Sequence, residues 1–270
     1  MVEINGVAVG TEVYPNKETI FKNSICSSGL TGDEININFR YESDGDITAL
    51  IMTKKYLDDV HSNTKVNLTM KYIPYSRMDR YIDGYMFSCK YFCEIINDLK
   101  FNRVFVLDPH SSVSVAVLQR VSEISIQPYL DKIIHENNID YVFYPDNGAC
   151  KKYPEKIKLP EHITYFYGNK KRNLQTGYIE KYELVNAPDL KDKNVLIIDD
   201  LCSKGMTFFL SGSEIKSKGA QNVYLYVSHL EDSVKEGKLL NSNIIDEIYT
   251  SDSIFNDYSQ EKITILKPIN

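Results

Sequence analysis

Two adjacent aspartates, Asp199 and Asp200, stand directly after an apolar run and before a short polar loop. The loop carries Ser203 and Lys204, and Thr207 follows at the expected start of a helix. In a strand–loop–helix turn, backbone N–H groups and the positive helix end converge on one point, which suits a phosphate. The two carboxylates suit sugar hydroxyls or a magnesium ion. The pattern therefore predicts a sugar-phosphate site; the alternative is a solvated turn capped by Ser203 or Thr207.

Acidic residues also end two other expected strands. Asp108 ends one apolar run and is followed by His110, and Asp146 ends another. Open α/β sheets bind ligands just beyond the carboxyl ends of their strands, so these side chains are expected at binding edges. Taken alone, His110 is better explained as a buried histidine with satisfied ring nitrogens.

The elements that must position these side chains alternate between strand and helix patterns. Expected strands cover residues 34–39, 65–75, 103–108, 141–146, 162–168, 194–200, 222–230, 245–252 and 262–268, with a short apolar run at 48–52. Expected helices cover residues 84–99, 128–138 and 207–217. This alternation predicts an α/β fold with mainly parallel sheets flanked by helices. We expect two domains, 1–123 and 124–270, because one strand–helix series ends near Glu123.

Composition narrows the class of protein. The chain has 270 residues, 43% of them hydrophobic, and a net charge of −6, which argues against nucleic acid or an anionic membrane as the main partner. No apolar run approaches the roughly 20 residues of a membrane span. The five cysteines form no C-x-x-C pair, which indicates reduced thiols and a cytoplasmic protein. Cys89 and Cys93 share a helix face and are expected to pack in the core rather than bind metal.

Several segments carry a resemblance to a known family. The stretch VLIIDDLCSKGMT (195–207) resembles the ribose-phosphate-binding motif of type I phosphoribosyltransferases and of phosphoribosyl pyrophosphate (PRPP) synthetases. Five further segments resemble PRPP synthetases in the same order: YIPYSRMDR (72–80), VFVLDPH (104–110), YPDNGA (144–149), GNKKRN (168–173) and VSHL (227–230). The resemblance implies two phosphoribosyltransferase-type domains and a homo-oligomer. The chain ends just after its last expected strand, so we expect it to lack the helix that usually ends this family.

The resemblance also implies an activity and its residues. Members transfer the diphosphate group of ATP, with Mg²⁺, to the anomeric hydroxyl of ribose 5-phosphate. The implied catalytic residues, on a loop able to close, are Lys170 and Arg172. The implied ATP-binding residues are Glu34, Arg77, Met78, Asp79, Arg80 and His110. The implied magnesium ligands are His110 and Asp146, with Asp108 orienting His110. The implied ribose and 5-phosphate site is Asp199, Asp200, Ser203, Lys204, Gly205, Met206 and Thr207.

Departures from the family pattern leave alternatives open. Met78 replaces the usual glutamine and Leu30 the phenylalanine that serves adenine, while Ser203, Lys204 and Met206 change the phosphate loop. The added charge and apolar side chain are compatible with a larger acceptor such as ADP-ribose, which would place the enzyme in NAD salvage. A catalytically silent regulatory homologue and a phosphoribosyltransferase that consumes PRPP are two further alternatives, the latter leaving residues 75–80 and 108–110 without a role.

Overall fold

The structure is a computed structural model that describes residues 1–22, 33–172 and 179–267, and side chains within this range except those of residues 170–181. The chain divides into two compact units, Met1–Ile124 and Ser125–Asn270. Each unit is built on its own mainly parallel sheet with helices packed against it. The helices of the described residues are all too short or too polar to cross a membrane.

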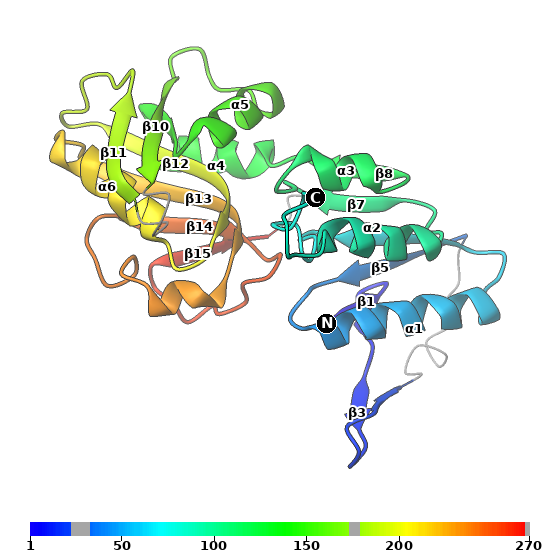
Figure 1. The fold of residues 1–270 in the computed structure, drawn as a ribbon. Coiled ribbons are helices and arrows are strands. Elements are labelled where there is room, and N and C mark those ends of the chain that lie inside the picture. The colour runs from blue at the N-terminus through cyan, green and yellow to red at the C-terminus, as the bar shows by residue number, and fades with distance from the viewer. Residues whose placement is uncertain (23–32, 173–178, 268–270) are drawn as a thin grey trace. The chain divides into compact units, whose positions relative to one another are not determined.

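Unit 1 contains a six-stranded sheet in the order β2-β1-β5-β6-β7-β8. Strands β5 to β8 are parallel, whereas β1 runs antiparallel to β2 and β5. Figure 1 shows α1 beside β1, and the two are in contact. The strands are β1 (Val2–Ile4), β2 (Val7–Ala8), β5 (Glu34–Phe39), β6 (Lys65–Met70), β7 (Val104–Leu107) and β8 (Val121–Ile124), with a separate hairpin of β3 (Thr11–Val13) and β4 (Thr19–Phe21). The helices are α1 (Asp44–Val60), α2 (Ser88–Asp98) and α3 (Ser112–Val117).

Unit 2 contains a seven-stranded sheet in the order β11-β10-β9-β12-β13-β14-β15. All neighbouring strands are parallel except β11, which pairs antiparallel with β10. The strands are β9 (Tyr141–Tyr144), β10 (Thr164–Arg172), β11 (Ile179–Val185), β12 (Asn194–Cys202), β13 (Asn222–Leu230), β14 (Glu247–Ser251) and β15 (Ile263–Leu266). The helices are α4 (Gln127–Glu136), α5 (Asn147–Lys156), α6 (Met206–Ser217) and the 3-10 helix η1 (Asp232–Glu236).

The core of each unit follows from its apolar runs. Val195 to Ile198 of β12 are fully buried, because a strand covered on both faces by helices has no solvent side. The apolar run at 48–52 belongs to helix α1, where Leu50 and Leu57 lie seven residues apart and are both fully buried. Cys89 and Cys93 of α2 are buried in the core of unit 1, as predicted.

Candidate functional site

The aspartates of β12 lie beside α5 at the carboxyl end of the strand. Asp200 is 7% exposed, and its backbone N–H donates a hydrogen bond to the Asp199 carboxylate (3.0 Å). Lys152 of α5 approaches the other side of Asp200, with 3.7 Å between its Nζ and Oδ2. Lys152 is not among the site residues predicted from the sequence, because helix α5 is not predicted there. One cation and two neighbouring carboxylates therefore meet at this edge.

The pKa of Asp199 is raised well above its ordinary value, chiefly because burial disfavours the charged form. The negative charges of Asp200 and Asp146 raise it further. Asp146 follows β9, the direct neighbour of β12, so adjacent parallel strands bring the three carboxylates together. A divalent cation or hydroxyl donors would relieve this repulsion.

Asp146 also has a structural role. It is the N-cap of α5, and its Oδ1 accepts a hydrogen bond from the Ala149 backbone N–H (3.0 Å). A capping aspartate satisfies an otherwise unbonded amide at a helix start. The sequence predicts Asp146 as a magnesium ligand but does not predict helix α5, which Asp146 caps.

The two roles of Asp146 can be separated by substitution. We expect Asp146→Asn to keep the cap, since the amide oxygen still accepts from Ala149, whereas Asp146→Ala should lower the free energy of unfolding by about 1 kcal/mol. If Asp146 also holds magnesium, both variants and His110→Ala should weaken Mg²⁺-dependent ATP binding by about tenfold, because a neutral side chain binds Mg²⁺ poorly. Calorimetric titration and thermal unfolding measure the two effects. Unchanged Mg-ATP affinity in all three variants would contradict the metal assignment.

The loop after β12 turns sharply at Gly205. Its φ of +77° is left-handed, and a Cβ there would lie 2.9 Å from the Leu239 side chain, so only glycine fits without displacement. Helix α6 begins directly at Met206, and no side chain caps it. Met206 is 47% exposed, and Thr207 is half-buried. The first backbone N–H groups of α6 are therefore not capped by a side chain and can bind a phosphate.

Two polar residues of the loop are held by the segment that follows β13. Ser233 donates to Glu231 (3.0 Å), so its bond with Ser203 (3.0 Å) uses the Ser203 proton. Lys204 forms an ion pair with Glu236 (2.8 Å), and both side chains are about two-thirds exposed. In this arrangement the Ser203 hydroxyl and the Lys204 ammonium both bind protein groups.

The predicted ATP segment of unit 1 follows β6. Tyr75 has a φ of +61°, and its hydroxyl donates to the Asp44 carboxylate at the start of α1 (2.6 Å). The backbone N–H of Met78 donates to the Tyr75 carbonyl (2.9 Å). Arg77 and Arg80 are exposed, which leaves them at the surface, where a nucleotide can reach them.

The other predicted ATP residues of unit 1 are only partly brought together. The pKa of the Cys89 thiol is lowered mainly by a hydrogen bond with Cys93. The charges of Asp79 and His110 also shift this pKa, so both side chains lie near Cys89. Glu34 begins β5 and accepts a hydrogen bond from Asn67 (3.1 Å). Arg77 and His110 follow the carboxyl ends of strands parallel to β5. Glu34 is the first residue of β5, so it lies at the opposite, amino-terminal end of these strands. Leu30 lies outside the described residues.

Lys170 and Arg172 lie in β10 and not in a loop. The strand continues past its pairing with β9 and pairs with β11, placing Lys170 opposite Tyr182 and Arg172 opposite Ile179, with an irregularity between Lys171 and Arg172. Residue 173, which ends the motif, and the side chains of Lys170 and Arg172 lie outside the description. Their catalytic role stays a prediction.

The predicted magnesium ligands belong to different units, His110 to unit 1 and Asp146 to unit 2. Within the described residues, no group of three or more His, Cys, Asp or Glu side chains has the arrangement of a metal site. The pairing of His110 with Asp146 therefore stays a prediction.

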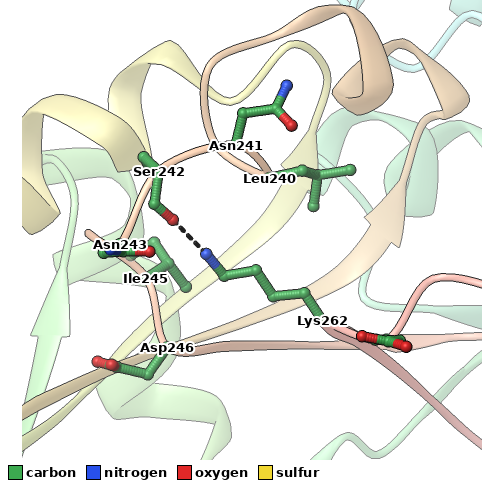
Figure 2. A pocket seen from close by; sticks show the side chains of 8 residues that line it. Leu240, Asn241, Ser242, Asn243, Ile245, Asp246 and Lys262 are labelled. Atoms are coloured by element: carbon green, nitrogen blue, oxygen red, sulfur yellow. Dashed lines mark hydrogen bonds between the residues drawn. The ribbon is translucent and has the colours of Figure 1, made fainter.

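A pocket of about 510 Å³ lies elsewhere in unit 2, and none of the predicted site residues lines it. Figure 2 shows Lys262 reaching across it; its Nζ donates to the Ser242 carbonyl. Asp246, also in the lining, accepts a hydrogen bond from the Val223 N–H (2.7 Å) and forms an ion pair with Lys216 (2.8 Å). Lys262 and Asp246 thus hold neighbouring strands and loops.

Comparison with known proteins supports the sequence motifs. A ribose-phosphate pyrophosphokinase of Saccharolobus solfataricus is 27% identical over 236 residues, covering 83% of this chain and 77% of that protein. Another, of Sulfurisphaera tokodaii, is 25% identical over 277 residues, covering 99% and 92%. No family model matches the chain. The crystal structure of phosphoribosylpyrophosphate synthetase from Mycobacterium smegmatis superposes with a TM-score of 0.72 at 16% identity, covering 96% of this chain and 86% of that one.

These findings confirm the predicted resemblance and the α/β fold. The relatives match the chain over most of both lengths, so the likeness is not limited to the loop at 195–207. The structural match spans both units. The chain is therefore similar in sequence to the ribose-phosphate pyrophosphokinases and has the fold of a phosphoribosylpyrophosphate synthetase.

Proposed function

We propose that the protein transfers the diphosphate group of ATP to the anomeric hydroxyl of ribose 5-phosphate. The observation that carries the proposal is the end of β12, where Asp199 and Asp200 precede a glycine turn and an uncapped helix start. Carboxylates accept hydrogen bonds from a sugar diol, and helix-start amides bind the 5-phosphate. The similarity to ribose-phosphate pyrophosphokinases supports the same activity.

Such a transfer depends mainly on positioning and charge neutralisation. We assign Arg77 and Arg80 to the nucleotide phosphates or base, and Lys170 and Arg172 to the charge that develops on the transferred group. Met78 and Asp79 would line the same nucleotide site. Glu34, at the far edge of its sheet, would reach a nucleotide only if a second copy of the chain brought it there, which agrees with the expected homo-oligomer.

Magnesium fits the carboxylates of unit 2. Oxygen ligands are those Mg²⁺ prefers. The pKa of Asp199 is raised mainly by burial and further by the charges of Asp200 and Asp146, and a cation would relieve that repulsion. Asp146 and Asp199 would hold the ion directly or through water. When bound, Mg²⁺ would neutralise the phosphates of ATP. The protein's own residues would orient the ribose and align its anomeric hydroxyl.

The ion pair of Lys204 favours the smaller acceptor. The second phosphate of ADP-ribose would need Lys204 as its cation, and in this structure that cation is paired with Glu236. Lys204→Ala should therefore change the KM for ribose 5-phosphate by less than about twofold, because exposed ion pairs contribute little. Glu236→Ala is the matched control and should behave alike. A severalfold rise in KM in Lys204→Ala, measured by initial rates, would place Lys204 on the substrate.

The proposed function is tested by product analysis. The protein is incubated with Mg-ATP and either ribose 5-phosphate or ADP-ribose, and mass spectrometry measures AMP and the acceptor's gain of one diphosphate. We expect AMP and the gain with ribose 5-phosphate. Turnover only with ADP-ribose would correct the acceptor, and no turnover with either would favour the catalytically silent alternative.

A further inference from the structure

Tyr182 of β11 connects three elements around the aspartates. Its hydroxyl donates a hydrogen bond to the backbone carbonyl of Pro145 (2.7 Å), the residue between β9 and Asp146. The hydroxyl of Ser211 in α6 interacts with the same oxygen. Helix α6 also packs against β11. One phenol thus joins β11, the end of β9 and the helix that follows the glycine turn.

The fit around this phenol depends on Gly168 of β10. A Cβ at residue 168 would lie 2.2 Å from the Tyr182 hydroxyl oxygen and 2.8 Å from the Pro145 carbonyl oxygen. No real Cβ approaches other atoms this closely, so a larger residue would displace the phenol. The glycine leaves the space that the Tyr182 hydroxyl fills.

The hydrogen bond between Tyr182 and Pro145 lies next to the proposed catalytic residues. Tyr182 pairs directly with Lys170 in the β10–β11 register. Burial raises the pKa of Tyr182, Ser211 opposes the rise, and the negative charges of Asp146 and Asp199 add to it. The phenol therefore stays protonated at working pH and remains a donor to Pro145.

We propose that Tyr182 is a positioning residue for catalysis. Its bond to Pro145 fixes the β10–β11 pair, and with it the backbone at Lys170 and Arg172, relative to Asp146 and Asp199. The proposal rests on the function proposed above, because positioning matters only if these residues act on one substrate. A displacement of a catalytic group by about 1 Å is enough to slow such a transfer strongly.

The test compares Tyr182→Phe with the parent protein. The variant keeps the ring and loses only the hydroxyl, so kcat should fall about tenfold, the effect of one hydrogen bond. The KM values for ATP and ribose 5-phosphate should stay within about twofold, since the proposed role of the phenol is to hold the backbone through Pro145 and not to bind substrate. Hydrogen exchange should become faster in residues 164–172 and 179–185. Gly168→Ala, which displaces the phenol by another route, should lower kcat similarly.

The matched control is Tyr249→Phe, which removes a tyrosine hydroxyl of the same sheet bonded to Glu247 (2.9 Å) and Asn137 (3.3 Å). It should keep the parental kcat and parental exchange in β10 and β11. Parental kcat in Tyr182→Phe, or equal losses in Tyr182→Phe and Tyr249→Phe, would overturn the proposal. If the parent protein has no activity, the proposed function fails. Unchanged hydrogen exchange in Tyr182→Phe would then also show that the Tyr182–Pro145 bond does not hold the β10–β11 pair in place.

Discussion

Replacing Lys170 or Arg172 with alanine should lower the kcat for diphosphate transfer by about a hundredfold or more, because preorganised positive charge acts mainly on the transition state. The unfolding midpoint should shift by no more than about 2 °C, since alanine keeps the backbone pairing of β10 with β11. Steady-state kinetics and calorimetry on the same samples measure both effects. The expected result is a large loss of rate in a protein of nearly parental stability.

Lys171→Ala is the matched control for this pair, because it removes the same charge from the same strand. It should keep kcat within about threefold of the parent, because no catalytic role is assigned to Lys171. Near-parental turnover in both Lys170→Ala and Arg172→Ala would remove these residues from the mechanism. Losses of equal size in all three variants would indicate a general effect of net charge on the hairpin.

The sheet was largely predictable because its strands are buried on both faces. Such strands appear in the sequence as continuous apolar runs, as in Val195 to Ile198. The run at 48–52 has similar residues but forms part of a helix, and the missed signal was the capping box of Ser43 and Asp46 before it. Helix α5 was missed because it has few apolar residues and contains Pro154.

The site was predictable only where strand ends carry it. Asp146, Asp199 and Asp200 come together because β9 and β12 are neighbours, which the chain order alone does not specify. The partners of the other site residues depend on the tertiary fold and not on local sequence. Glu236 neutralises Lys204 across a segment folded back from β13, and Tyr182 reaches Pro145 from a strand whose pairing with β10 has no local sequence pattern.

Asp199→Asn and Asp200→Asn should have opposite effects on stability. The pKa of Asp199 is raised, so between its unfolded value of 3.8 and its folded value the native state binds more protons. Its contribution to stability is therefore complete below the unfolded pKa and is lost as pH rises through the window. Asparagine at position 199 removes this titration. Near pH 7.5 it should raise the unfolding midpoint by about 2–4 °C, which corresponds to roughly 1 kcal/mol of unfolding free energy. Asp200→Asn removes the carboxylate beside half-buried Lys152 and should lower the unfolding midpoint.

Both variants should nevertheless lose activity together. Each removes a charged acceptor proposed for the ribose diol, so kcat/KM for ribose 5-phosphate should fall by about a hundredfold, the range for hydrogen bonds to charged groups. Thermal unfolding from pH 4 to 8 should give a flatter pH profile for Asp199→Asn than for the parent, and added Mg²⁺ should stabilise the parent more than either variant. A parental pH profile in Asp199→Asn would show that this carboxylate is already charged in the native protein. In that case mutual repulsion among the aspartates could no longer be the reason for a cation to bind there.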